Sequence, residues 1–203
     1  MDKISEANKL FWIGQYYYSE KNYDEMKKYY LMAIDSNVST AMNNLGSYYG
    51  TVENNYDEMK KYYLMAIDLN NSIALSNLGF YYETVENNYD EMKKYYLMAI
   101  DLNNSTAMHN LGFYYKTVEK NYDEMKKYYL MAIDLNDSTA MYYLGFYYGT
   151  VENNYDEMKK YYLMAIDHNC EYTIRVCKKQ NYFHSTRIKN AIFNNPNFRT
   201  VSK

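Results

Sequence analysis

Paired acidic residues are the first groups in this sequence that could do chemistry. The stretch NYDEMKKYYLMAID occurs five times, beginning at Asn22, Asn55, Asn88, Asn121 and Asn154, so an Asp-Glu pair returns every thirty-three residues. Two neighbouring carboxylates can bind a divalent metal or serve as general acid and base. Each pair, however, directly follows an asparagine and opens a helical pattern, where acidic side chains stabilise the first turn. We therefore expect the Asp-Glu pairs to start helices and not to form a metal or catalytic site.

Histidine and cysteine, the other residues with catalytic or metal-binding potential, are sparse. His109 lies in the fourth repeat, and no nucleophile is predictable beside it, so we expect a surface or contact histidine. Near the C-terminus, His168, Cys170, Cys177 and His184 suggest a zinc site. On a helix the two cysteines would lie about 10.5 Å apart along the axis, too far for their thiolates to share a zinc ion or a disulfide. The sequence predicts no enzyme activity, no metal site and no cofactor.

The thirty-three-residue period predicts a helical repeat architecture. Within the copy at 39–71, apolar residues recur with the spacing of one helical face over 41–52 and again over 56–67. The polar stretches VENN and DLNN between these segments form turns and are too short for linkers. Each repeat is therefore expected to be a pair of antiparallel helices.

The second helix of each repeat carries a start signal. Asn55 can cap the helix while Glu58 reaches back to the Asn55 backbone N–H, as in a capping box. Asp57 and Lys61 are spaced for an i, i+4 ion pair. The charged half of the repeated stretch is thus expected to start the helix and keep its outer face polar.

A glycine stands inside the first helix of every repeat, at Gly14, Gly46, Gly79, Gly112 and Gly145. Glycine in a helix interior costs close to ~1 kcal/mol relative to alanine. A compensating contact is therefore expected, in which an aromatic ring of the second helix, such as that of Tyr63, lies against the first helix where a Cβ is missing.

These motifs resemble tetratricopeptide repeats, whose pattern is met in the first unit by Ile13, Gly14, Tyr17, Tyr23, Met26, Tyr30 and Ala33. The pieces LGSYYGTVENNYD and YYLMAI also resemble Sel1-like repeats. The resemblance implies an all-α, right-handed solenoid with five repeats over residues 1–169 and a basic capping segment at 170–203. Together with the abundance of residue types that AT-rich codons specify, these motifs also resemble the Sel1-like arrays of giant DNA viruses.

When the repeats starting at 39, 72, 105 and 138 are aligned with one another, most positions are nearly identical, but three positions vary strongly. We call these three positions the variable columns. They are Asn43/Ser76/His109/Tyr142, Ser47/Phe80/Phe113/Phe146 and Gly50/Glu83/Lys116/Gly149. Their i, i+4, i+7 spacing places them on one stripe of the first helix. In tetratricopeptide arrays, the resemblance implies, this stripe lines a concave groove that contacts an extended peptide. The alternative is that these positions are exposed and drift freely.

The predicted partner-binding residues follow from that stripe and from the asparagines beside it, whose amides can bond a peptide backbone. They are Asn43, Asn44, Ser47, Ser76, Asn77, Phe80, Glu83, His109, Asn110, Phe113, Lys116, Tyr142 and Phe146. Lys116 is the single lysine on the stripe, so a clamp for chaperone C-terminal carboxylates is not expected. A short apolar or aromatic peptide segment fits the three phenylalanines better.

The C-terminal segment differs chemically from the repeats, since residues 168–203 hold seven Lys or Arg and one Glu. Aromatic residues interleave with these charges, so the segment could bind nucleic acid. It could instead cover the last repeat with apolar residues such as Ile174, as the open end of a solenoid requires. Its charge could also pair with the acidic repeats. The capping interpretation is preferred.

The sequence as a whole predicts a non-catalytic scaffold for protein–protein interaction, with a protein or peptide partner that is a host protein if the chain is viral. The alternative is a structural module that self-assembles through its groove or its open repeat ends. The start MDKISEANKLFWIG lacks a basic region and a long apolar run, and YYLMAI is far shorter than the roughly 20 residues of a membrane span. We therefore expect a cytoplasmic protein, in the host cytoplasm if viral.

Overall fold

A computed structural model describes residues 3–168, 170, 171 and 173–175. The α-helices in these residues are α1 (Lys3–Ser19), α2 (Tyr23–Ile34), α3 (Ser39–Thr51), α4 (Tyr56–Ile67), α5 (Ser72–Tyr81), α6 (Tyr89–Asp101), α7 (Ser105–Tyr114), α8 (Tyr122–Asp134), α9 (Ser138–Thr150) and α10 (Tyr155–Asp167). Two π-helical segments, η1 (Tyr82–Glu86) and η2 (Tyr115–Glu119), continue α5 and α7. The described residues contain no strand, and the predicted all-α fold is confirmed.

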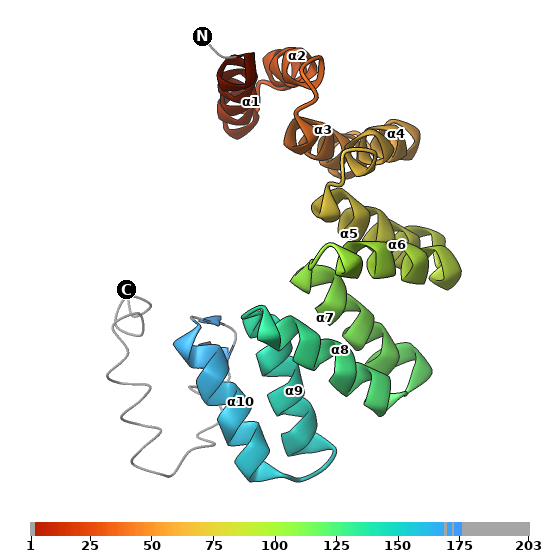
Figure 1. Cartoon of the computed structure of the whole chain (residues 1–203), viewed down its shortest axis with the longest axis vertical. Helices are drawn as coiled ribbons and strands as arrows, with labels where there is room; N and C mark the ends of the chain where they lie inside the picture. The colour runs from red at the N-terminus through yellow and green to blue at the C-terminus, as the bar shows by residue number, and fades with distance from the viewer. Residues whose placement is uncertain (1–2, 169, 172, 176–203) are drawn as a thin grey trace. The chain divides into compact units, whose positions relative to one another are not determined.

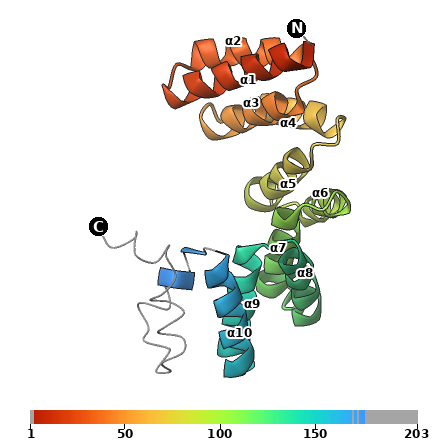
Figure 2. The same cartoon turned by 60° about the vertical axis from the view of Figure 1, so that its left-hand side comes forward.

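Consecutive helices lie side by side as pairs, each joined by a short connection (Figures 1 and 2). The contacts between α1 and α2, α3 and α4, α5 and α6, and α9 and α10 are extensive, and η2 packs on α8. The chain forms two compact units, Met1–Ala107 and Met108–Lys203. The first, unit 1, holds α1 to α6 and the start of α7, and the second, unit 2, holds the rest of α7 to α10.

The predicted asparagine caps are present. In α2, α4, α6, α8 and α10 the Asn side chain accepts a hydrogen bond from the backbone N–H of the Glu three residues later. The predicted hydrogen bond from the Asn55 backbone N–H to the Glu58 side chain is wrong, because this N–H donates to the Tyr49 carbonyl at 2.8 Å. Glu58 turns to Lys61 instead, with 2.9 Å between Oε2 and Nζ, so the expected Asp57–Lys61 pair is also wrong.

The predicted role of the helix glycines is confirmed. A Cβ placed on Gly46 would lie 2.8 Å from Cδ1 of Tyr63, and one on Gly14 would lie 2.5 Å from Cδ1 of Tyr30. The ring therefore occupies the space that any larger residue would need. Tyr63 and Tyr30 are buried in the core of unit 1 together with Leu45.

A second tyrosine of each repeat stacks across its helix pair. Tyr49 stacks on Tyr62 with ring centroids 5.6 Å apart, and Tyr82 stacks on Tyr95 at 5.5 Å. The same contact recurs in Tyr17–Tyr29, Tyr115–Tyr128 and Tyr148–Tyr161. The unusual number of tyrosines is thus largely accounted for by packing.

A polar contact that we call the inter-repeat clasp joins successive repeats. Glu53 accepts hydrogen bonds from the Tyr48 hydroxyl at 2.7 Å and from the Lys27 ammonium of the preceding repeat at 3.1 Å. Equivalent clasps use Glu86 with Tyr81 and Lys60, and Glu152 with Tyr147 and Lys126. The hydrogen bonds from Tyr48 and Lys27 lower the pKa of the Glu53 carboxyl. The first lysine of the repeated KK pair therefore joins repeats, which departs from the expectation that both lysines only cover the outer surface.

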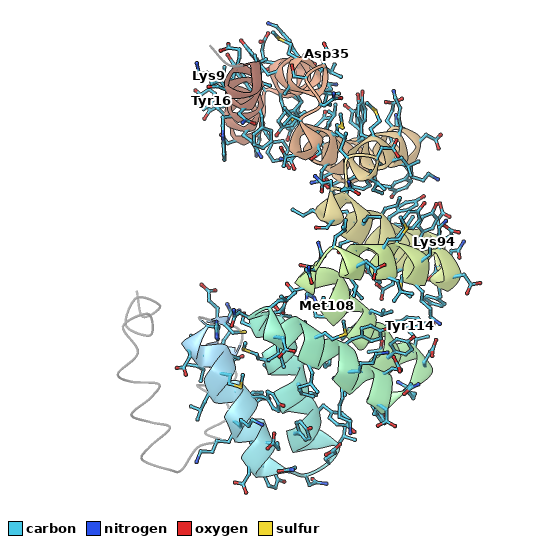
Figure 3. All side chains as sticks on the ribbon, viewed as in Figure 1. Lys9, Tyr16, Asp35, Lys94, Met108 and Tyr114 are labelled. Carbon is cyan, nitrogen blue, oxygen red and sulfur yellow. The ribbon has the colours of Figure 1, made fainter. Side chains whose placement is uncertain are left out.

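The second lysine of the pair does cover the outer surface. Lys94, labelled in Figure 3, extends outward from α6 and pairs with Glu91 at 2.9 Å. The equivalent pairs Lys61–Glu58, Lys127–Glu124 and Lys160–Glu157 are exposed in the same way.

The two π-helical segments coincide with a change of residue type. Repeats with Gly50 or Gly149 keep an α-helix through that position, whereas repeats with Glu83 or Lys116 there are π-helical. A Cβ on Gly50 would lie 2.5 Å from Sδ of Met59. In the third and fourth repeats, a side chain at this position accompanies the wider helical turn. Such π-segments often occur at functional sites.

The predicted capping segment at 170–203 lies mostly outside the described residues. Of its first residues, Cys170, Thr173 and Ile174 are buried and Arg175 is exposed. Cys177 and His184 of the rejected zinc site, and most of the basic residues weighed for nucleic-acid binding, also lie outside.

Candidate partner-binding surface

The first variable column is not an exposed surface. Asn43, Ser76 and Tyr142 are buried, and His109 is half-buried. The Asn77 amide donates to Oδ1 of Asn43 across repeats at 3.0 Å. Tyr142 stacks on Tyr162 with ring centroids 5.7 Å apart. The variation in this column therefore changes packing between helices.

The asparagines beside the stripe are engaged within the protein. Asn44 accepts a hydrogen bond from the Asn43 amide at 3.1 Å and also hydrogen-bonds the Tyr30 hydroxyl. Asn77 and Ser47 both hydrogen-bond the buried Tyr63 hydroxyl, with 2.9 Å between Ser47 Oγ and Tyr63 Oη. These side chains satisfy tyrosine hydroxyls of the core, which is a role that the sequence reading missed. Asn110 is half-buried.

His109 is held by the start of the following repeat. Its Nδ1 lies 3.3 Å from Oδ2 of Asp137, and Asp137 caps α9 by accepting from the Ala140 N–H at 2.9 Å. This contact gives His109 a structural partner. Within the described residues, no group of three or more His, Cys, Asp or Glu is arranged to hold a metal ion.

The second variable column is the exposed one. Phe80 in unit 1 is 54% exposed, and Phe113 and Phe146 in unit 2 are 38% and 37% exposed. In unit 2 the Phe113 ring lies 5.5 Å from the Tyr143 ring, and the Phe146 ring lies 6.2 Å from the Tyr142 ring. Neighbouring aromatic residues thus hold the two phenylalanines of unit 2 in place.

The third variable column carries the half-buried charges of the stripe. The Glu83 carboxylate accepts a hydrogen bond from the Tyr96 hydroxyl at 2.8 Å, and burial raises the pKa of Glu83 although this bond opposes the shift. The Lys116 ammonium lies 4.9 Å from the centre of the Phe146 ring and 5.6 Å from that of Tyr143. Burial lowers the pKa of Lys116.

A pocket of about 270 Å³ opens in unit 1 next to the predicted residues Asn44 and Ser47. Its lining is otherwise made of Gln15, Tyr18, Tyr30 and Tyr48. Amide and hydroxyl groups share this wall with tyrosine rings. Gln15 could have been found from the sequence, because it follows Gly14 as Ser47 follows Gly46.

A sequence model of the tetratricopeptide repeat matches residues 10–37, which lie in the first helix pair. A search of curated proteins gave no match. None of the helices in the described residues combines the length and the apolar character that a membrane span requires.

Several solved structures share the arrangement of helices. A Sel1 repeat protein from Oxalobacter formigenes matches 79% of this chain and 71% of its own, with a TM-score of 0.65 and 24% identity. The immunity protein Pa5087 from Pseudomonas aeruginosa matches 86% of this chain and 73% of its own, with a TM-score of 0.65 and 23% identity. The protective antigen c5321 of uropathogenic Escherichia coli, described as displaying an SLR fold, matches 91% of this chain and 47% of its own, with a TM-score of 0.64 and 17% identity.

Repeat folds of this kind generally serve as scaffolds for protein interaction. The helix pairs, the glycine–tyrosine contact and the matches to a tetratricopeptide model and to Sel1-repeat structures agree with one another. Residues 10–37 therefore match a tetratricopeptide repeat, and the described residues share the helix-pair fold of solved Sel1-repeat structures.

Proposed function

We propose that this chain is a non-catalytic scaffold that binds segments of a partner protein through the first helices of its repeats. The exposed phenylalanines Phe80, Phe113 and Phe146 carry this proposal. They occupy one position in three successive repeats, and the repeat with Ser47 there forms the same pair of helices. Packing therefore does not require phenylalanine at this position, and large exposed apolar side chains are typical of interaction sites.

The polar pocket in unit 1 supports the same function. Gln15, Asn44 and Ser47 present amide and hydroxyl groups on its wall. Such groups can hydrogen-bond the backbone of an extended peptide while neighbouring rings contact its side chains. The repeats thus offer both polar and apolar contacts to a partner.

Affinity capture from extracts of the native cells tests the proposal. A triple variant with Phe80, Phe113 and Phe146 changed to Ser adopts the residue that Ser47 already provides, so its fold should be preserved. The matched control changes Leu64, Leu97 and Leu130 to Ser, because these residues are 45%, 44% and 42% exposed on second helices.

We expect a partner protein that is captured by the wild type and by the leucine variant but lost with the phenylalanine variant. Equal capture by both variants, or loss with the leucine variant alone, would remove the first-helix surface as the binding site.

A second candidate function, self-association, is favoured by the first repeat. Tyr16 is 59% exposed, whereas the equivalent Tyr48 is 4% exposed because the second helix of the preceding repeat covers it. Tyr16 and Lys9 extend from the side of α1 that faces away from α2 (Figure 3). Trp12 and Ile13 are exposed on the same helix.

A second copy of this chain is the occupant proposed for this face, since the two copies would cover each other's aromatic residues. Sedimentation velocity over a concentration series would show a dimer that Trp12→Lys abolishes. A monomer at every concentration would exclude this candidate.

A further inference from the structure

The fourth repeat contains two hydrogen-bond donors for which its own side chains supply no acceptor. The Tyr129 hydroxyl is fully buried and has no hydrogen-bond partner among the residues that the structure describes. The half-buried Lys116 ammonium contacts the Phe146 and Tyr143 rings. In the third repeat the equivalent residues Glu83 and Tyr96 bond each other. The change from Glu83 to Lys116 has therefore removed an acceptor and added a donor.

The other acceptors that serve these tyrosines are also missing around Tyr129. Tyr63 uses Ser47 of its own repeat and Asn77 of the next. The residues equivalent to these two are Phe113 and Tyr143, and the Tyr143 ring stacks on that of Tyr129 with 6.1 Å between centroids. Aromatic rings have thus replaced the polar groups on this side of repeat 4.

Lys116 is placed differently from the lysines of the outer surface. Lys127 lies 4.8 Å from the centre of the Tyr128 ring but also pairs with Glu124 at 2.9 Å. Lys116 has only the ring contacts in the described part of the chain, and it is carried by the π-helical η2. Burial, together with the nearby charge of Lys120, lowers the pKa of Lys116.

The rings next to Lys116 form an apolar wall that remains open to solvent. Phe113 and Phe146 are both exposed, and Phe113 packs on Tyr143. A half-buried cation gains most from an anion because the surrounding rings screen the pair from water. An apolar group attached to that anion would contact the wall at the same time.

We propose that Lys116, with Phe113, Phe146 and Tyr143 around it, binds a carboxylate that the ligand carries next to an aromatic group. The proposal rests on the proposed function and names the ligand chemistry of repeat 4. The carboxylate takes the place, from outside, of the acidic side chain that the third repeat carries at Glu83. It can belong to an Asp side chain beside an aromatic residue or to the C-terminus of an aromatic residue.

Three small probes separate these sources when titrated into the full-length protein. N-acetylphenylalanine carries a terminal carboxylate, acetyl-Asp-Phe-amide carries a side-chain carboxylate, and acetyl-Asn-Phe-amide is the neutral counterpart. The signals of Lys116 Cε in protein with isotope-labelled lysine report binding at the site. At least one acidic probe should shift these signals saturably, and the neutral peptide should bind about tenfold more weakly, because a hydrogen bond to a charged group is lost.

Matched variants test whether Lys116 itself is responsible. Lys116→Glu restores the residue of the third repeat, so it should keep the fold and abolish binding of the acidic probes. Lys116→Gln should weaken their binding about tenfold, the loss expected for one charge-assisted contact. Lys127→Gln, which removes a lysine that already has a carboxylate partner, should leave binding unchanged.

Equal binding of the acidic and neutral probes, or equal effects of the Lys116 and Lys127 variants, would overturn the proposal. The proposed function fails separately. A partner captured independently of the phenylalanines would reject the first-helix surface even if acidic probes bind at Lys116. A partner that depends on the phenylalanines, with acidic and neutral probes bound alike, would reject only the carboxylate site.

Discussion

Equivalent tyrosines in this chain have different surroundings, so the same substitution should have opposite effects in two repeats. Tyr63 is buried and its hydroxyl is hydrogen-bonded by Ser47 and Asn77, whereas the buried Tyr129 hydroxyl has no hydrogen-bond partner within the described part of the chain. Leaving a buried polar group unpaired is unfavourable, because its hydrogen bond to water is lost and not replaced. Burial accordingly raises the pKa of Tyr129.

Tyr63→Phe should therefore lower the free energy of unfolding by about 1 kcal/mol, while Tyr129→Phe should raise it by a similar amount. Urea denaturation followed by circular dichroism measures both changes. A loss of stability in Tyr129→Phe would show that its hydroxyl has a partner in solution.

Two glycines of the same helix should also respond differently to alanine. A Cβ on Gly46 would meet both the Tyr63 ring and the Met59 carbonyl oxygen, at 2.8 and 3.2 Å. Gly46→Ala should cost about 1–2 kcal/mol, since overpacking exceeds the gain in helix propensity. Gly50→Ala meets the flexible end of Met59, and the third repeat accommodates Glu83 at that position.

Gly50→Ala should therefore cause no loss of stability, and thermal unfolding of the two single variants provides the comparison. An equal loss in both would show that the Met59 side chain cannot move away.

The sequence predicted the packing role of the helix glycines because a glycine inside a helix needs a compensating contact. It did not predict the roles of Asn44 and Asn77, because an amide on a half-buried face can bond either a ligand or a neighbouring hydroxyl. Only the positions of Tyr30 and Tyr63 show that these amides serve the core. The exposed phenylalanines were correctly predicted to be accessible, because their position varies between repeats. The two other variable columns, which were predicted on the same grounds, are partly or fully buried.

At the scale of the element, the end of the first helix in repeats 2 to 5 varies with one residue. Gly50 and Gly149 leave room for the methionine of the second helix, and Glu83 and Lys116 accompany π-helical segments. Lys116→Gly should therefore convert residues 115–119 from π-helical to α-helical hydrogen bonding. A crystal structure of this variant checks the change, with Lys116→Glu as the control that should keep η2. Retention of η2 in Lys116→Gly would assign the wider turn to another residue.

Helix boundaries were predictable where a side chain satisfies the first N–H groups, as Asn55 does for α4. The ion-pair partner of Lys61 was not predictable, because Lys61 can reach both Asp57 and Glu58 from one turn away. The π-segments were also missed, because they accompany a side chain at one position that faces the second helix, and local helix propensity does not report such a contact.

At the scale of the whole molecule, the inter-repeat clasps should make stability depend on pH. Hydrogen bonds from Tyr48 and Lys27 lower the pKa of Glu53, and those from Tyr81 and Lys60 lower the pKa of Glu86. A carboxyl with a lowered pKa in the folded state stabilises the fold above its unfolded pKa of about 4.3. That contribution is lost as the pH falls through the folded pKa.

The double variant Glu53→Gln, Glu86→Gln should therefore be less stable than the wild type at pH 7, by roughly 0.5 kcal/mol per clasp because the pairs are partly exposed. The difference in the free energy of unfolding between the variant and the wild type should shrink below pH 4. Urea unfolding at pH 7 and pH 3 measures this difference, and Glu25→Gln serves as the control because Glu25 pairs with the exposed Lys28 of its own helix and not with another repeat in the described residues. A difference that stays the same at pH 3 would show that the clasps act through shape and not through charge.

The repeat period made the arrangement of helix pairs predictable, since each pair needs a neighbour to bury its apolar face. The lysine of the clasp was not predictable, because its partner Glu53 lies in the loop of the next repeat and both residues are polar. The similarity to viral arrays, the cytoplasmic location and the basic cap at 170–203 stay predictions.

The identity of the second helices has a consequence for how the chain finds its pairing and how it evolves. The second helices α2, α4, α6, α8 and α10 share the sequence YDEMKKYYLMAI. Their sequences therefore do not specify which first helix each of them pairs with. Two features select the correct pairing. The short connections favour the adjacent helix, because a short loop costs the least entropy to close. Residues that differ between repeats, such as Ser47 and Glu83, also distinguish one first helix from another. Deleting one thirty-three-residue period would leave helices that still meet matching faces. Whole repeats can therefore be lost or gained while the fold is kept. Each new copy can then change the residues at the variable positions of its first helix.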